Sequence, residues 1–122
     1  MTLKEIADEL VAGCREGRER ANLDKLYAAD AVSVEAFAMG DMGRETHGLA
    51  GIHGKHDWWD ANNSVTGGKV EGPFLHGDDR FAVIFAVEGT SKADGKAFSM
   101  QEVAVYHVAG GKIVREEFFY TM

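Results

Sequence analysis

The sequence predicts an α+β domain in which a curved, mostly antiparallel sheet packs against helices near the N-terminus. Two observations predict this class: apolar residues repeat with helical spacing early in the chain, and strand-like segments follow one another after residue 63. No repeat, linker or change in composition divides the 122 residues. We therefore expect a single domain over residues 1–122, whose curved sheet can enclose a pocket for a small molecule.

Three helices are expected in the first half of the chain. The first begins after Thr2, which can form a capping box with Glu5, and ends near Gly17. The second is short, with Asn22 as its cap and Tyr27 near its end. The third places four side chains on one side, namely Leu49, Ile52, His56 and Trp59.

Strand-like segments make up most of the remaining sequence. Residues 31–37 are expected to form a first strand and residues 38–46 a loop. Turn signals at Asp94-Gly95 and Gly110-Gly111 separate later strands, which are expected over residues 64–71, 80–90, 97–108 and 112–121. The last three of these are expected to form an antiparallel meander.

Composition excludes several classes of partner. The chain has 13 Lys plus Arg against 20 Asp plus Glu, a net charge of −7, and no basic cluster. We therefore expect neither a nucleic acid nor an anionic membrane as partner, because both require cationic surfaces. No apolar run is long enough to cross a membrane and the start does not resemble a signal peptide, so a cytoplasmic location is expected.

Three short segments carry a resemblance to a known superfamily. They are Leu-Tyr-Ala-Ala-Asp-Ala-Val at residues 26–32, Glu-Val-Ala-Val-Tyr-His-Val at 102–108, and Gly-Lys-Ile-Val-Arg-Glu at 111–116. With the order of elements, they resemble the nuclear transport factor 2-like superfamily, and within it the SnoaL-like and ketosteroid-isomerase-like proteins, over nearly the whole chain. The resemblance implies a cone-shaped, cystatin-like roll with a pocket between helices and sheet, and a homodimer formed through the sheet. Members range from isomerases, cyclases and dehydratases to binding modules.

Carboxylates among apolar strand residues are the best candidates for acid–base chemistry, because burial raises the pKa of a carboxyl group. The resemblance places Glu35 where ketosteroid isomerases carry a catalytic aspartate, and Glu102 resembles their protonated hydrogen-bond donor. Glu35 can instead be a solvated strand residue, with Val32 and Val34 facing the core. The isomerase tyrosine has no counterpart, because the matching stretch of the first helix holds Val11 and apolar neighbours. This departure argues against steroid isomerase activity.

The pairing of the last two strands decides a third candidate. If Val108 pairs with Lys112, Glu116 shares a face with Glu102. If the turn has the two-residue form instead, the pairing shifts by one and Glu117 points inward beside an arginine. We favour the first pairing because the pocket-lining alternation of the family, carried onto this strand, selects Glu116, Phe118 and Tyr120.

The expected substrate-binding residues surround these glutamates. Adjacent tryptophans point in different directions, and the helical stripe assigns Trp59 rather than Trp58 to the pocket. The histidines at 47, 53 and 56 lack a metal-binding pattern, so neither a metal nor another cofactor is expected. Cys14 lies on an apolar stripe and is expected in the core. The full set of expected binding residues is Tyr27, His56, Trp59, Phe118 and Tyr120.

Two functions are consistent with these residues. The first is a cofactor-independent enzyme of isomerase, cyclase or dehydratase type, with Glu35 as base and Glu102 or Glu116 as its partner. Its substrate would be apolar and carbonyl-bearing or polycyclic. The alternative is a non-catalytic ligand-binding or structural homodimer whose glutamates hydrogen-bond to backbone or to His56. We favour the enzyme, because glutamates among apolar strand residues are costly unless they are used or well paired.

Overall fold

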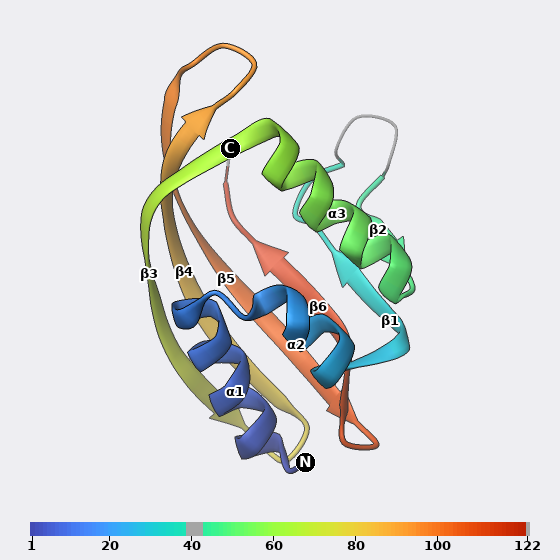
Figure 1. Ribbon diagram of the computed structural model, residues 1–122. Helices are drawn as coiled ribbons and strands as arrows, with labels where there is room; N and C mark the ends of the chain where they lie inside the picture. Colours follow the sequence, from blue (N-terminus) through green and yellow to red (C-terminus); the bar gives the residue numbers. More distant parts are fainter. Residues whose placement is uncertain (39–42, 122) are drawn as a thin grey trace.

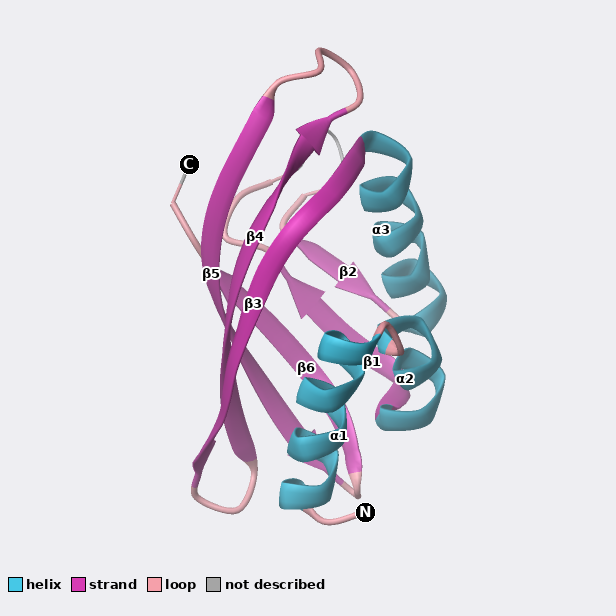
Figure 2. Ribbon diagram, turned by 60° about the vertical axis from the view of Figure 1, so that its left-hand side comes forward, coloured by secondary structure: helices cyan, strands magenta, loops and turns pink. Residues whose placement is uncertain are grey.

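A computed structural model describes residues 1–38 and 43–121, and its elements follow the predicted order (Figure 1). Three helices lie against one face of a six-stranded sheet, whose long strands curve around them (Figure 2). The predicted α+β class is therefore confirmed, with the helices on the concave side of an open sheet. Within the described ranges, no helix is long and apolar enough to cross a membrane.

The helices are α1 (Leu3–Glu16), α2 (Glu19–Leu26) and α3 (Leu49–Asn62). The predicted capping box at the start of α1 is confirmed, because the side chains of Thr2 and Glu5 each bond the other's backbone N–H. Gly17 ends α1 with φ at 77°, a left-handed conformation that favours glycine. Both ends of this helix were therefore predictable from local sequence.

The prediction that Asn22 caps the second helix is wrong. The helix begins one turn earlier, at Glu19, and Asn22 is buried within it. The side-chain amide of Asn22 donates a hydrogen bond to the backbone oxygen of Glu9 on α1, at 3.1 Å. Asn22 therefore joins two helices, a role that depends on their packing rather than on local sequence.

The sheet contains β1 (Tyr27–Val34), β2 (Glu45–His47), β3 (Asn63–His76), β4 (Arg80–Ser91), β5 (Ala97–Ala109) and β6 (Lys112–Phe119). The strands lie in the order β2-β1-β6-β5-β4-β3. Only the pair β1 and β6 is parallel among these neighbours, and β4, β5 and β6 form the predicted meander.

Several of the expected segments have different bounds, and the last strand ends at Phe119 rather than at residue 121. The first strand begins at Tyr27 rather than residue 31, because Tyr27 both closes α2 through its N–H and pairs with Ile113 in the sheet. The first strand ends at Val34 rather than at residue 37. Part of the loop expected over residues 38–46 forms β2, and residues 39–42 lie outside the described residues. The strand expected over residues 64–71 begins directly after α3 and continues to residue 76, since its pairing with β4 resumes after an irregularity.

The turn between β5 and β6 has the two-residue form, with Ala109 opposite Lys112. The favoured pairing of Val108 with Lys112 is therefore wrong. A bulge follows directly, in which β6 has one residue more than β5 between successive pairs. Because a shift of one residue exchanges the two faces of a strand, the bulge brings Glu116 opposite Tyr106 on the concave face. The expected face of Glu116 is thus correct, although the turn is not.

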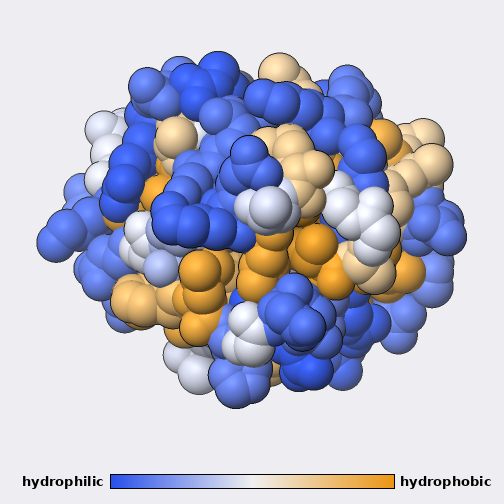
Figure 3. All heavy atoms as spheres, turned by 90° about the horizontal axis from the view of Figure 1, so that it is seen from below, coloured by the Kyte–Doolittle hydropathy of each residue, from blue (hydrophilic) through white to orange (hydrophobic). Residues whose placement is uncertain are grey.

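The hydrophobic core fills the space between the helices and the concave face. The Phe81 ring on β4 stacks on the Tyr106 ring on β5, with centroids 4.8 Å apart. At the end of the molecule near the N-terminus, apolar side chains are also exposed among charged ones (Figure 3). The largest fully buried side chains are Phe81, Ile6, Leu26, Ile52, Ile113, Val83 and Ser33.

Two glycines on α3 test how closely this helix packs on β2. A methyl group on Gly51 would lie 2.8 Å from the Thr46 methyl, whereas one on Gly54 meets no described atom within 4 Å. Alanine in place of a helix glycine adds about 1 kcal/mol of stability, and overpacking costs about 1–3 kcal/mol. We expect Gly54→Ala to stabilise the protein and Gly51→Ala to be at least about 1 kcal/mol less stable than Gly54→Ala in urea unfolding. Equal free energies of unfolding for the two variants would show that the Thr46 side chain can move away from the added methyl group at no cost.

Candidate functional site

Three glutamates and a lysine come together on the concave face from four parts of the chain. Glu35 follows β1, Glu102 lies on β5 and Glu116 on β6, while Lys55 projects from α3. The charges of Glu35, Glu116 and Lys55 all act on the pKa of Glu102. The structure therefore gathers the three predicted carboxylates, and we name these four residues the glutamate cluster.

Lys55 and Glu35 form a largely buried ion pair. Lys55 Nζ lies 3.0 Å from Glu35 Oε1, and only 14% and 17% of the two side chains are exposed. The same ammonium group donates to Ser33 Oγ at 2.7 Å, and the Tyr120 hydroxyl donates to Glu35 Oε2 at 3.2 Å. Such additional hydrogen bonds are what make a buried ion pair tolerable. Glu35 is therefore not the solvated strand residue of the alternative interpretation.

Glu116 is the most deeply buried of the glutamates, with 4% of its surface exposed. The Tyr27 hydroxyl donates a hydrogen bond to Glu116 Oε2 at 2.5 Å. Burial raises the pKa of Glu116, although the hydroxyls of Tyr27 and Ser33 act in the opposite direction. Burial, together with the neighbouring Glu116 charge, also raises the pKa of Tyr27. The structure thus places Tyr27 as the partner of a core carboxyl.

Glu102 differs from the other two glutamates because no hydrogen-bond donor among the described residues contributes to its pKa. Burial raises that pKa to about 7, and the negative charges of Glu35 and Glu116 add to the effect. The positive charge of Lys55 acts against them. Near neutral pH, Glu102 is therefore poised both to take up and to release a proton.

Aromatic side chains surround the cluster. The Phe118 ring lies 5.4 Å from Lys55 Nζ, within the range of a cation–π contact. The ring of Tyr120 lies 5.8 Å from that of Phe37, just beyond the end of β1. Two of the expected binding residues, Phe118 and Tyr120, therefore contact the cluster directly.

The other expected binding residues of α3 have different neighbours. Burial and the positive charge of Arg20 lower the pKa of His56. The Trp59 ring packs edge-on against Phe98 at 5.8 Å, near the β4–β5 hairpin. Trp58 is 44% exposed and Trp59 is partly buried, so the prediction that they point in different directions is confirmed.

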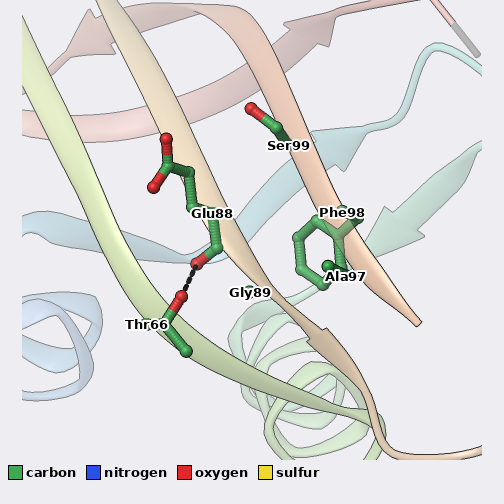
Figure 4. A pocket seen from close by; sticks show the side chains of 6 residues that line it. All are labelled: Thr66, Glu88, Gly89, Ala97, Phe98 and Ser99. Carbon is green, nitrogen blue, oxygen red and sulfur yellow. Dashed lines mark hydrogen bonds between the residues drawn. The ribbon is translucent and has the colours of Figure 1, made fainter. Parts of the chain in front are cut away.

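A shallow depression of about 370 Å³ lies where β3, β4 and β5 approach the hairpin end of the sheet (Figure 4). There the Thr66 hydroxyl donates to the backbone oxygen of Glu88 at 3.3 Å. The depression is separate from the glutamate cluster, since the two share no residue; it is lined by Thr66, Glu88, Gly89, Ala97, Phe98 and Ser99.

His53 and Cys14 have identifiable partners in the fold. His53 Nε2 lies 2.9 Å from Asp24 Oδ1. In the described ranges, no three His, Cys, Asp or Glu side chains are arranged to hold a metal ion. Burial raises the pKa of Cys14 to about 12, and its side chain packs against the core as expected.

Sequence reasoning missed Lys55. A lysine on a helix is usually solvated, and the preceding interpretation placed only apolar and histidine side chains on the inner stripe. The signal was nevertheless present, because Lys55 stands three residues after buried Ile52 and four before Trp59. Its importance depends on Glu35, which comes from a segment 20 residues earlier in the chain.

A family model described as a SnoaL-like domain matches residues 1–120. The chain belongs to the SnoaL-like family. No curated protein matches the sequence. The membership confirms the resemblance inferred from the three sequence segments, and with it the expected cone-like α+β fold.

Several solved structures share this fold. One is a Mesorhizobium loti protein described as a candidate SnoaL-like polyketide cyclase, with the added label carbohydrate phosphatase. Its sequence is 38% identical to this chain, and the two structures superpose with a TM-score of 0.91 over 98% of this chain and 100% of that one. A nuclear transport factor 2-like protein from Burkholderia thailandensis is 20% identical, with a TM-score of 0.83 over 99% and 92% of the chains. TerC, co-crystallised with polyporic acid, is 22% identical, with a TM-score of 0.73 over 96% and 89%.

The raised pKa of Glu102 predicts a specific dependence of stability on pH. Between its ordinary value of 4.5 and about 7, the folded protein keeps a proton that the unfolded chain releases, so stability falls as pH rises through this window. We expect wild type to lose about 3 kcal/mol relative to Glu102→Gln between pH 4.5 and 8, measured by urea unfolding. The exposed Glu71→Gln change serves as control. Parallel curves for wild type and Glu102→Gln would contradict the burial of this carboxyl.

Proposed function

We propose that this protein is a cofactor-independent acid–base enzyme acting on an apolar, carbonyl-bearing or polycyclic small molecule held on the concave side of the sheet. One observation carries the proposal: the half-buried Glu102 carboxyl, without a described donor, faces the buried Lys55–Glu35 ion pair. A proton acceptor and a fixed cationic donor in a water-poor place are what proton transfer from carbon requires.

The geometry favours an exchange of the roles expected from sequence. Glu35 already has an ion-pair partner in Lys55 and a hydroxyl donor in Tyr120, and Glu116 is sealed in the core. Glu102 has neither constraint and exchanges its proton near neutrality. We therefore assign proton transfer to Glu102, with Glu35 and Glu116 as the charges that adjust its pKa. Phe118 and Tyr120 would contact the substrate.

The comparisons support the substrate class. The Mesorhizobium loti protein, 38% identical over nearly the full length, is described as a candidate polyketide cyclase. TerC was crystallised with polyporic acid, and its likeness to this chain extends to the fold alone. A reaction of isomerase, cyclase or dehydratase type is consistent with both, because each begins with proton transfer beside a carbonyl group.

Hydrogen–deuterium exchange tests proton abstraction without knowledge of the natural substrate. We expect wild type to accelerate deuterium uptake beside the carbonyl of fused-ring ketones such as 2-tetralone in D2O, followed by NMR. The rate should rise with pH through about 7, as Glu102 loses its proton. Glu102→Gln should lower the rate by about 100-fold or more.

Glu71→Gln, an exposed change on β3, should leave the exchange rate unaltered. Exchange that is equal in wild type and Glu102→Gln would overturn the assignment of Glu102. Binding of these ketones without any exchange would favour the alternative, a non-catalytic ligand-binding module.

We also propose a homodimer formed through the outer face of the sheet. Val103 and Phe119 are paired across β5 and β6 on the face opposite Glu102, and they are 37% and 50% exposed. Phe74 on β3 is 51% exposed and pairs with Ala82, on the same face. Contiguous exposed apolar side chains on a sheet are typical of an association surface.

Light scattering at micromolar concentration tests the dimer. Wild type should have twice the 13.3 kDa mass of one chain, and Val103→Lys should have the mass of one chain, because a lysine would be desolvated in the contact. Val65→Lys, at a more exposed apolar residue of β3 on the other face of the sheet, should remain dimeric. A monomeric wild type would exclude the dimer.

A further inference from the structure

Lys55 supplies the positive charge of the glutamate cluster. Its Nζ lies 2.7 Å from Ser33 Oγ and 3.0 Å from Glu35 Oε1, and it stands 5.4 Å from the Phe118 ring centroid. A lysine ammonium group carries three N–H donors, and the hydrogen bond to Ser33 and the ion pair with Glu35 take at most two of them. One donor therefore has no partner among the residues that the structure describes.

The charges around Lys55 favour the binding of an additional negative group. The ion pair with Glu35 is neutral as a unit, and burial favours the uncharged forms of Glu102 and Glu116. An added negative oxygen would then lie beside an ammonium group in a place of low dielectric, where a charge-assisted hydrogen bond is strong. Because Ser33 and Glu35 already fix the ammonium group, it need not reorganise when charge develops.

We propose that Lys55 binds the negatively charged oxygen of the ligand, so that the site takes conjugated enols, and ketones that can enolise, as their oxyanions. This rests on the proposed function. In the reaction, the Glu102 carboxylate removes the proton from the carbon beside the carbonyl. The electrons of that C–H bond form a C=C bond, and the carbonyl π electrons move to the oxygen. This oxygen then accepts a hydrogen bond from the free N–H of Lys55. Glu102 then returns the proton to another atom, so no oxidant or reductant is needed.

A phenol probe tests oxyanion binding apart from catalysis. The phenol and phenolate forms of 4-nitrophenol absorb at different wavelengths, and the free probe is mostly neutral at about pH 6. Addition of wild type at this pH should produce the phenolate band. Lys55→Met keeps the length of the side chain but removes its charge, and it should abolish the band and weaken binding about tenfold or more.

Two further variants complete the test. Lys55→Arg keeps a positive charge and should restore part of the phenolate band, whereas Lys69→Met, at an exposed lysine of β3, should behave as wild type. Lys55→Gln provides a second neutral variant, and circular dichroism checks the fold of each. If Lys55 acts only through packing, Lys55→Arg should not restore the phenolate band. That result would overturn the inference.

The outcomes separate this inference from the proposed function. Wild type that binds only neutral 4-nitrophenol, or not at all, overturns the role of Lys55 in holding an oxyanion. So does an undiminished phenolate band in Lys55→Met. If ketone exchange in D2O still depends on Glu102 in either case, the proposed function stands without the inference. Loss of that exchange in wild type would instead remove the proposed function itself.

Discussion

The cost of placing three carboxylates on an apolar face is the constraint on which the rest of this structure depends. A buried carboxylate must be paired, hydrogen-bonded or protonated, because the interior does not solvate its charge. The chain uses a different solution for each: an ammonium group for Glu35, a tyrosine hydroxyl for Glu116 and a raised pKa for Glu102. The partners come from α3 and from the junction of α2 with β1. The cluster therefore forms only when helices and sheet are assembled together.

A single irregularity in β6 decides which side chains meet there. After the two-residue turn, an unbroken ladder would direct Glu117 inward and Glu116 outward. The bulge reverses these directions, so that Glu116 reaches the Tyr27 hydroxyl while Glu117 bonds Arg115 at 3.2 Å on the other face. A feature of one residue thus sets the charge inside the domain, which is consistent with the use of bulges to redirect side chains near functional sites.

The two faces of the sheet have different physical characters. The concave face combines a dense apolar core under α1 and α2 with the glutamate cluster under α3, and Trp59 packs on Phe98 one helical turn from Lys55. The outer face carries exposed apolar side chains, including Phe119, with no element of the described chain covering them. The proposed proton transfer and the proposed dimer contact therefore lie on opposite sides of one layer, and a change on one side need not disturb the other.

Local sequence determined the elements, and tertiary structure decided their partners. The capping box at Thr2, the glycine at the end of α1 and the alternation of the late strands predicted the order of elements, because each depends on residues close in the chain. The shared face of Glu102 and Glu116 was predicted from the resemblance to the family, because strand alternation by itself left two pairings open and could not reveal the bulge in β6. Sequence could not reveal that Asn22 joins two helices or that Lys55 neutralises Glu35, because such pairings depend on how distant segments pack and on which charges are then buried.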